Sequence, residues 1–179
     1  MTESLDFIFK RRSIRKFTDR PISEEDLTLL LQAGMAAPTA MNVRPWEFVV
    51  VTDREIIQQL RDSLVFGKHD PAAVIAVCGN TRFSNAKAAN RFWVQDCSAA
   101  MENILLAATA LGFGSVWVGV HPVTLFVKRV SEVLNLPASI TPLGLIYLGY
   151  PAEQKEPRTQ YDARKVHWQQ YGKGNGGSN

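Results

Sequence analysis

Hydrophobic positions recur along the chain with two different spacings, one typical of helices and one typical of strands. The helical spacing predicts helices at about residues 5–12, 24–36, 54–64, 85–111 and 123–134. Runs rich in β-branched and aromatic residues predict strands between them, at about residues 46–52, 72–78, 115–120 and 140–147. Helices and strands therefore interleave along most of the chain.

The predicted long helix, residues 85–111, is apolar or small on nearly every side of its second half. A helix without a polar face has to be covered all round, either by its own core or by a partner. We favour a seam between two copies of the chain. A helix fully buried in the core of one chain is the alternative, and the sequence leaves both open.

Two other segments carry little periodicity. Residues 37–42 have small side chains with a Pro and an Asn, which suits a loop whose backbone approaches a ligand, although an ordinary helix-to-strand connection has the same composition. Residues 152–179 are polar, so we expect an arm from Arg158 to Trp168 that lies across another surface. We predict a single domain over residues 1–170 and a disordered tail over residues 171–179.

Composition changes this picture only slightly. The chain has 179 residues, of which 46% are hydrophobic and 21% are charged, so it should fold as an ordinary globular domain. Its formal charge of +3 permits an anionic cofactor but does not indicate nucleic acid. Cys78 and Cys97 have no further ligands at metal-site spacing, and no secretory or membrane-spanning segment is visible. We expect a cytoplasmic protein with no metal, no membrane and no nucleic-acid partner.

The strongest candidate for chemistry is the basic run Arg11-Arg12-Ser13-Ile14-Arg15-Lys16-Phe17. Guanidinium groups bind phosphate oxygens in pairs, and a serine hydroxyl adds a further short donor. The apolar side chains in the run look like anchors into a core. The alternative is an exposed, frayed helix end, and this stretch alone does not decide between the two.

Further motifs follow in a fixed order, and with the basic run they resemble the FMN-dependent nitroreductase family from about Phe7 to Trp168. They are Ala37-Pro38-Thr39-Ala40-Met41-Asn42, Arg44-Pro45-Trp46-Glu47-Phe48, Asn103-Ile104-Leu105-Leu106-Ala107-Ala108, Leu111-Gly112-Phe113-Gly114-Ser115, Leu148-Gly149-Tyr150-Pro151, Arg158 and Val166-His167-Trp168. The resemblance implies an α+β fold with a mixed central sheet wrapped by helices. It also implies an intertwined homodimer with FMN bound at the interface.

By this resemblance, the phosphate of FMN would be held by Arg11, Ser13 and Arg158, with Arg12 beside the phosphate and the ribityl chain. Arg15 would reach the pyrimidine edge of the flavin, where a cation stabilises the negative charge that reduction adds. The backbone at Trp117, Val118 and Gly119 would line the flavin. The partner subunit would bring Pro38, Thr39 and Asn42 to the same site.

Some positions depart from the family pattern. Gln160 stands where relatives often carry a second basic residue, so Arg164 or Lys165 is a candidate contributor to the phosphate site. Arg44 replaces a residue that is often Gln, which would favour anionic partners at the pocket mouth. The short chain also leaves little room for an inserted lid, so we expect an open pocket with loose substrate choice.

The function implied is an oxidoreductase that uses NADH or NADPH to reduce nitroaromatics, quinones or similar small-molecule acceptors by a ping-pong mechanism. No catalytic side chain is expected, because the cofactor carries the chemistry. His69, His121 and His167 have no nucleophile or carboxylate at a telling spacing and are predicted to be structural or exposed. A specialised flavin enzyme of the same fold, such as a dehalogenase or dehydrogenase, and a non-enzymatic flavin- or anion-binding protein are the alternatives.

Overall fold

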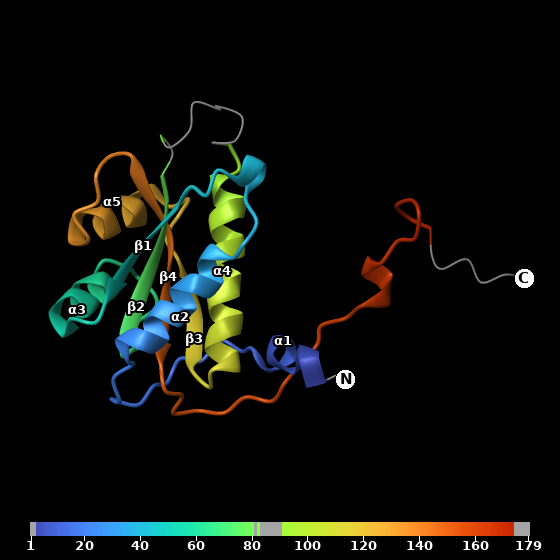
Figure 1. Cartoon of the computed structure of the whole chain (residues 1–179), viewed down its shortest axis with the longest axis horizontal. Helices are drawn as coiled ribbons and strands as arrows, with labels where there is room; N and C mark the ends of the chain where they lie inside the picture. Colours follow the sequence, from blue (N-terminus) through green and yellow to red (C-terminus); the bar gives the residue numbers. More distant parts are fainter. Residues whose placement is uncertain (1–2, 81, 83–90, 174–179) are drawn as a thin grey trace, which may run out of the picture.

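The apolar runs form a four-stranded sheet in the computed structural model, which describes residues 3–80, 82 and 91–173 (Figure 1). The strand order is β1-β2-β4-β3, and neighbouring strands are antiparallel throughout. The strands are β1 Trp46–Val51, β2 Ala73–Asn80, β3 Gly114–Gly119 and β4 Ile140–Gly149. The central pair is therefore β2 and β4, and both β1 and β3 are edge strands.

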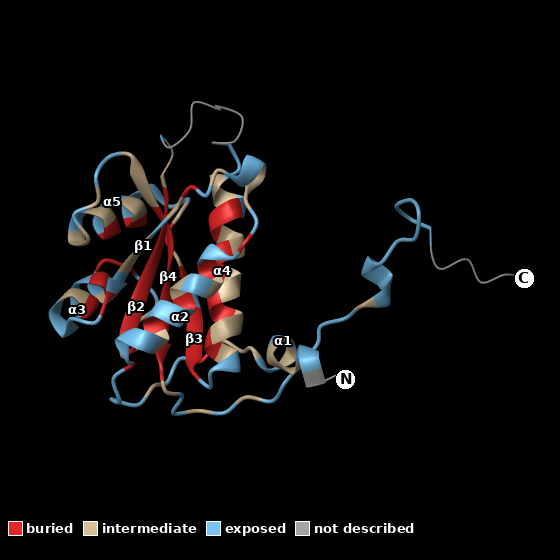
Figure 2. Ribbon diagram, viewed as in Figure 1, coloured by how far each residue is buried: buried red, intermediate tan, exposed pale blue. Residues whose placement is uncertain are grey.

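Strand β2 reads as one continuous apolar run because helices cover both faces of the sheet. Side chains alternate between the two faces, so Ile75 and Val77 belong to one core cluster, and Val74 and Ala76 belong to the other. All four side chains are fully buried. Figure 2 shows this as a band of buried residues that runs through the middle of the molecule.

One face of the sheet is covered by α2 (Glu24–Met35) and α4 (Trp93–Ala110), and the other by α3 (Arg54–Asp62) and α5 (Thr124–Val133). Gly34 lets α2 approach α4 closely, because a Cβ atom there would lie 2.9 Å from the Ile104 side chain. The Asn103 amide donates to the Ala33 carbonyl at 3.0 Å and fastens the same contact. Two helix layers therefore enclose the sheet.

The helix starts follow from local sequence. Ser23 Oγ accepts the N–H of Asp26 at 3.0 Å, and Asp53 accepts the N–H groups of Glu55 and Ile56. Each side chain thus satisfies backbone donors at the start of its helix. The first helix, α1 (Asp6–Lys10), is a little over one turn and delivers the basic run at its end, while shorter 3-10 turns cover η1 Glu3–Leu5, η2 Ala40–Asn42 and η4 Ala163–Lys165.

The predicted α+β class with helices around a sheet is confirmed. The named strands pair only in the antiparallel sense, and the parallel pairing of this sheet is an isolated bridge between Ser13 and Ser115. The strand predicted at about residues 72–78 ends slightly later, because β2 continues through Asn80 in its pairing with β4. The predicted helix start at Asn85 lies outside the described residues, and the helix runs from Trp93 where the structure describes it.

Helix α4 is buried on one face only, where Ala100, Met101, Ile104 and Ala108 pack on the sheet. On its outer side Leu106 and Ala107 are partly exposed, and Leu111, just past the helix end, is 45% exposed. The alternative of a helix fully buried within one chain is therefore wrong. The seam between two copies stays a prediction.

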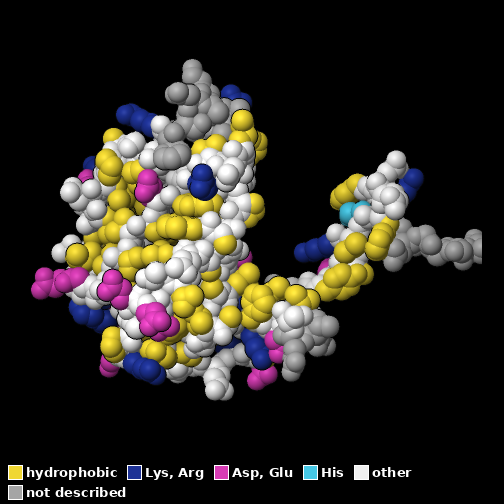
Figure 3. Space-filling model, in the orientation of Figure 1, with side chains coloured by type: hydrophobic (Ala, Val, Ile, Leu, Met, Phe, Trp, Pro, Cys, Tyr) yellow, Lys and Arg dark blue, Asp and Glu magenta, His cyan; other side chains and the backbone are white. Residues whose placement is uncertain are grey.

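After β4 the chain passes under the sheet to α1 and then extends away from the body as an arm, residues 157–173 (Figure 1). This arm is exposed over most of its length (Figure 2), and its apolar side chains include Tyr161 at 74% and Tyr171 at 92% exposure. Figure 3 shows these hydrophobic side chains grouped along the arm. Of the predicted disordered tail, residues 171–179, residues 174–179 lie outside the described part.

Cys78 and Cys97 are free and fully buried in the two core layers. Burial raises the pKa of each thiol to about 12, so both stay protonated at neutral pH. The Cys97 thiol donates to the Cys78 carbonyl at 3.4 Å. Both cysteines are therefore small core residues rather than reactive groups.

Leu60 on α3 and Leu125 on α5 form a matched pair for testing the core, because Leu60 is fully buried and Leu125 is 50% exposed. We predict that Leu60→Ala lowers the free energy of unfolding by about 2–5 kcal/mol, through lost burial and a residual cavity. Leu125→Ala should change it by less than about 0.5 kcal/mol. Urea denaturation followed by circular dichroism measures both, and equal losses would contradict this assignment of the core.

Candidate functional site

The basic run crosses the N-terminal end of β3 in an extended conformation. Ser13 pairs with Ser115 in the isolated bridge, and the N–H of Ile14 donates to the Ser115 carbonyl at 2.9 Å. Ile14 is buried against Gly114, where a Cβ atom would lie 2.7 Å from its side chain. Phe17 forms a bridge with Pro151 and packs on the backbone of the last strand. The two predicted anchors are confirmed, and the frayed-helix interpretation is wrong.

A second segment, residues 150–156, runs antiparallel to the basic run and holds it from the other side. Backbone bonds join Thr18 N to Tyr150 O and Ala152 N to Lys16 O, each at 2.9 Å. We call these paired segments, residues 12–18 and 150–156, the double strap. Both begin or end at the sheet, so the strap is anchored at the ends of β3 and β4.

Side chains of the double strap hold its backbone as well. The Glu153 carboxylate accepts the N–H of Arg15 at 2.6 Å, and Lys155 donates to the Ser13 carbonyl at 2.5 Å. Lys155 and Glu153 also form an ion pair at 3.2 Å. The backbone at Ser13 and Arg15 is therefore fixed by charged groups from a segment more than a hundred residues away in sequence.

The predicted cations gather around this strap. Arg11 Nε lies 3.4 Å from a Glu102 oxygen on α4, and the Arg12 guanidinium donates to the Glu156 carbonyl. Arg158 is brought back to the first helix, because its N–H donates to the Phe9 carbonyl at 3.1 Å. Residues from both ends of the chain thus meet at one place, while their role in binding phosphate stays a prediction.

Arg164 and Lys165, the candidates for a phosphate contact that Gln160 cannot make as a cation, lie further along the arm. Arg164 is engaged with Asp162 in the same 3-10 turn, with a closest approach of 2.9 Å. This pair raises the pKa of Arg164 and lowers the pKa of Asp162, so each group stabilises the charge of the other. A contribution of Arg164 or Lys165 to an anion site in its own chain is not supported by this position.

Next to the strap, a pocket of about 360 Å³ opens along the outer edge of β3. Its walls include three stretches of chain: the basic run, the segment between α3 and β2, and the edge strand. The lining residues are Arg15, Phe66, Gly67, His69, Val116, Trp117, Val118 and Gly119. Four predicted cofactor residues, Arg15, Trp117, Val118 and Gly119, are therefore brought together.

The edge strand supplies backbone donors and acceptors to this pocket. In an antiparallel pair, alternate residues direct their N–H and C=O groups to the partner strand and away from it. Ser115 directs its carbonyl away from β4, toward Ile14. The same alternation directs the backbone groups of Trp117 and Gly119 outward, so they are available to a planar polar ligand at the edge.

The wall opposite β3 is fastened to α3 by charged groups. Asp70 accepts from Arg54 at 2.7 Å and from Arg61 at 3.0 Å, and Lys68 donates to the Arg61 carbonyl at 2.7 Å. These contacts fix the backbone on both sides of His69. The wall is therefore held in place by contacts within its own chain.

The charges of the pocket act on the groups in it. Burial and then the nearby Arg15 lower the pKa of His69, with smaller contributions from Arg61 and Lys155, while Glu153 opposes them. Behind the pocket, burial raises the pKa of Tyr147 to about 12, so its hydroxyl is neutral. Among the described residues, the buried Ser115 hydroxyl has no hydrogen-bond partner, so it is available beside the basic run.

The structure does not bring Pro38, Thr39 and Asn42 to this pocket. They lie in the loop at the N-terminal end of α4, whereas α1 and the basic run lie toward its C-terminal end (Figure 1). The buried Asp96 carboxylate accepts the Ala40 N–H at 2.9 Å and holds the loop, in which Met41 and Asn42 have positive φ angles of 53° and 54°. Within one chain these residues form a separate feature.

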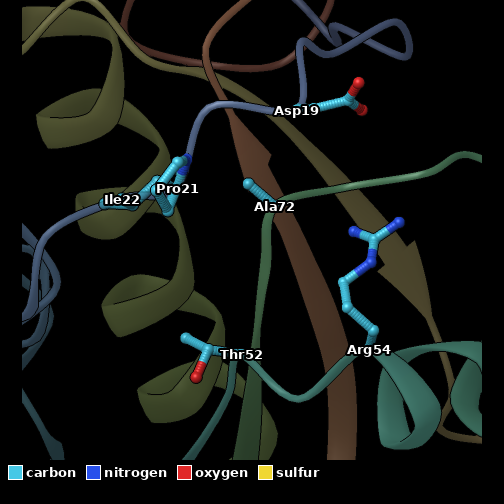
Figure 4. Close-up of a pocket in the computed structure, with 6 residues that line it drawn as sticks. All are labelled: Asp19, Pro21, Ile22, Thr52, Arg54 and Ala72. Atoms are coloured by element: carbon cyan, nitrogen blue, oxygen red, sulfur yellow. The ribbon is translucent and has the colours of Figure 1, made fainter.

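Another pocket has, among the described residues, no cation that is free to bind a ligand. Figure 4 shows this pocket of about 350 Å³ beside the end of β1, lined by Asp19, Pro21, Ile22, Thr52, Arg54 and Ala72. Its only cation, Arg54, is already bonded to Asp70 and to the Pro71 carbonyl. In the described part of the chain no cluster of side chains suits a metal ion, and no helix has the length and hydropathy to cross a membrane.

The residues fit an anionic, planar cofactor. Arg15 stands in the pocket wall, and an indole and outward backbone groups stand along it. The Ser115 hydroxyl, unpartnered among the described residues, lies on β3 next to the lining residue Val116. Sequence reasoning missed Glu153, Lys155, Phe66 and His69. Glu153 and Lys155 are brought to the site by the antiparallel pairing of the double strap. Phe66 and His69 are brought there because the segment between α3 and β2 approaches β3. Neither contact has a local signal in the sequence.

The fold and the site define an α+β protein with a pocket and cations at the open edge of its sheet, and the comparisons specify the family. The nitroreductase family model matches residues 8–67 and 65–150. An Archaeoglobus fulgidus protein, provisionally named NADH dehydrogenase/NAD(P)H nitroreductase, is 46% identical over 158 residues, covering 87% of this chain and 90% of that protein.

Solved structures agree with this match. A protein of Bacteroides thetaiotaomicron with the same provisional name has a TM-score of 0.88 and 39% identity, covering 96% of this chain and 99% of that one. An FMN-dependent nitroreductase of Clostridium difficile R20291 has a TM-score of 0.85 and 29% identity, covering 93% and 99%. The chain belongs to the nitroreductase family.

The strap can be tested through Glu153, whose pKa is lowered by the hydrogen bond from the Arg15 backbone and by Lys155. A lowered pKa in the folded state stabilises the protein above the usual value of 4.5, and this contribution is lost as the pH falls through the lowered value. We predict that Glu153→Gln is less stable than the parent at about pH 7, by up to about 1 kcal/mol, and that the difference shrinks at about pH 3.

Chemical denaturation at both pH values measures this difference. Glu132→Gln is the matched control, because Glu132 forms only an exposed i,i+4 pair with Lys128 at 3.8 Å. A Glu153→Gln deficit that is the same at both pH values would show that the carboxylate charge is not what holds the strap.

Proposed function

We propose that this protein is an FMN-dependent oxidoreductase that takes electrons from NADH or NADPH and reduces nitroaromatics, quinones or similar small acceptors. The observation that carries the proposal is the pocket at the β3 edge, where Arg15 and the outward backbone of Trp117 and Gly119 meet beside the cationic strap. The names of the relatives support the two redox partners, since one mentions NAD(P)H and another mentions FMN.

The phosphate of the cofactor would bind where the cations gather. Arg11, Arg12 and Ser13 from the basic run, and Arg158 from the returning chain, offer guanidinium and hydroxyl donors within one region. Lys155 lies at the Ser13 carbonyl and adds a positive charge that the sequence did not assign. The positive potential of this region also favours a dianionic group over a neutral one.

When bound, the cofactor supplies hydride and electron transfer, and the protein supplies binding, orientation and charge. Arg15 enters the pocket wall with its backbone fixed by Glu153, so its guanidinium can stabilise negative charge that reduction places at the nearby ring edge. Trp117 is 37% exposed and offers an apolar surface in the pocket. Nicotinamide and acceptor would occupy this open pocket in turn, which gives ping-pong kinetics.

The active form in this proposal is an intertwined homodimer. Pro38, Thr39 and Asn42 lie away from the pocket of their own chain, so a second copy would bring them to it. The arm and the outer face of α4 leave apolar side chains exposed, as expected of surfaces that a partner covers. One domain over residues 1–170 and a location in the cytoplasm, where NADH and NADPH are supplied, complete the proposal.

The function is tested by purifying the protein and recording its visible absorbance before and after adding FMN. We expect a yellow, FMN-type spectrum that NADH or NADPH bleaches under anaerobic conditions, followed by recovery when a nitroaromatic or a quinone is added. Halogenated compounds in the same assay distinguish a dehalogenase. Protein that neither carries nor takes up FMN would refute the proposed function.

Arg11 and Lys10 provide a matched pair for the phosphate site, because Lys10 is exposed and forms an i,i+4 pair with Asp6 at 2.9 Å. We predict that Arg11→Ala weakens FMN binding by about 2–3 kcal/mol, roughly 30- to 150-fold in Kd, through loss of a charge-assisted contact. Lys10→Ala should change Kd less than about threefold. Fluorescence titration of FMN into apoprotein gives both values, and an unchanged Kd for Arg11→Ala would remove Arg11 from the site.

A further inference from the structure

His69 is the one histidine among the described residues that lines the candidate cofactor pocket. It comes from the segment between α3 and β2 and stands in the same pocket as Arg15 and Trp117. The other two histidines are elsewhere, His121 against the Trp93 ring and His167 on the exposed arm. The prediction of a purely structural or exposed role therefore does not describe the position of His69.

The position of His69 is set by its neighbours in sequence. Lys68 donates to the Arg61 carbonyl at 2.7 Å, Arg61 donates back to the Lys68 carbonyl at 3.3 Å, and Asp70 is bonded to Arg61 and Arg54. These contacts pin the backbone on both sides of the imidazole. The ring is thereby held in the pocket wall.

Charged groups reach His69 from every element around it. Arg15 comes from the basic run, Arg61 from α3, and Lys155 and Glu153 from the strap segment after β4. Three cations and one carboxylate thus act electrostatically on the ring. With burial, this balance lowers the pKa of His69, so the ring is uncharged in the empty pocket at neutral pH.

A negative charge that enters the pocket changes this balance. It would lie beside Arg15, in the wall that also contains His69, and would offset the cations that keep the ring uncharged. Negative charge beside the ring favours its protonated form, so it acts against the burial and the cations that lower the pKa of His69. Reduction of a flavin is such an event.

We propose that His69 is the proton acceptor that is coupled to reduction in this pocket. This inference rests on the proposed function. The nicotinamide is oxidised and delivers two electrons and one proton to the flavin as a hydride. A second proton comes from solvent and forms an N–H bond at the free ring nitrogen of His69. When electrons pass on to the acceptor, the ring releases this proton to the acceptor or to solvent, which restores the starting state.

The test is the pH dependence of the midpoint potential of protein-bound FMN, measured for the parent protein and for His69→Asn. Each extra proton taken up with two electrons changes the potential by about 30 mV per pH unit. We expect the parent protein to show a slope steeper by up to about 30 mV per pH unit than His69→Asn, in the range where the reduced protein holds the proton and the oxidised protein does not.

Two controls separate this role from a general effect. His167→Asn removes an imidazole from the exposed arm and should keep the parent slope. NMR of the His69 ring in the parent protein gives its pKa directly, and we expect this pKa to rise when bound FMN is reduced with dithionite. This measurement does not depend on how well the His69→Asn variant folds.

The outcomes distinguish the two proposals. Retention of FMN with equal slopes in the parent protein and His69→Asn, or with a His69 pKa that does not change on reduction, would overturn the role of His69 alone. Failure of the parent protein to bind FMN would overturn the proposed function together with this inference. A slope difference with a rising His69 pKa supports both.

Discussion

The site depends on the antiparallel pairing of residues 12–18 with residues 150–156 at the end of the sheet. This double strap fixes an extended, strongly basic run where repulsion between like charges would otherwise leave it exposed and mobile. The Glu153 carboxylate accepts a hydrogen bond from the backbone of this run, and the Lys155 ammonium donates one to it. The two side chains also form an ion pair with each other. The carboxylate offsets part of the repulsion between the cations, while the net charge of the region stays positive. Without the strap there would be basic residues but no arranged anion site.

Edge strand β3 forms one wall of the pocket. A central strand uses its backbone groups in hydrogen bonds to both neighbours. Within the described residues, β3 pairs with β4 on one side and only with Ser13, through an isolated bridge, on the other. The remaining outward groups are satisfied by water or by a ligand, and the pocket wall at His69 limits the space beside them. An open sheet edge, which proteins usually protect, therefore becomes a binding surface for a planar polar group.

The same geometry explains how a few cations can both bind and tune a cofactor. In the proposed function Arg11, Arg12 and Arg158 attract the phosphate, while Arg15 and His69 stand in the pocket wall. A fixed guanidinium responds to added negative charge only by attraction, but an uncharged imidazole responds by taking up a proton. In our proposals the two side chains thus give the pocket a permanent and a pH-dependent response to reduction.

The sequence by itself determined the elements of the body and the family, because periodicity, caps and short motifs are local. Ser23 and Asp53 cap helices through neighbouring N–H groups, and the runs at residues 72–78 and 140–147 are apolar because both faces of the sheet are covered. The sequence also marked Arg11, Ser13 and Arg15 as an anion site. Only the tertiary structure decided that Glu153, Lys155 and His69 belong beside them, since that depends on strand pairing between distant segments. Only the tertiary structure likewise showed that Pro38 to Asn42 lie away from this pocket in their own chain, since that depends on packing against α4, which no local pattern encodes.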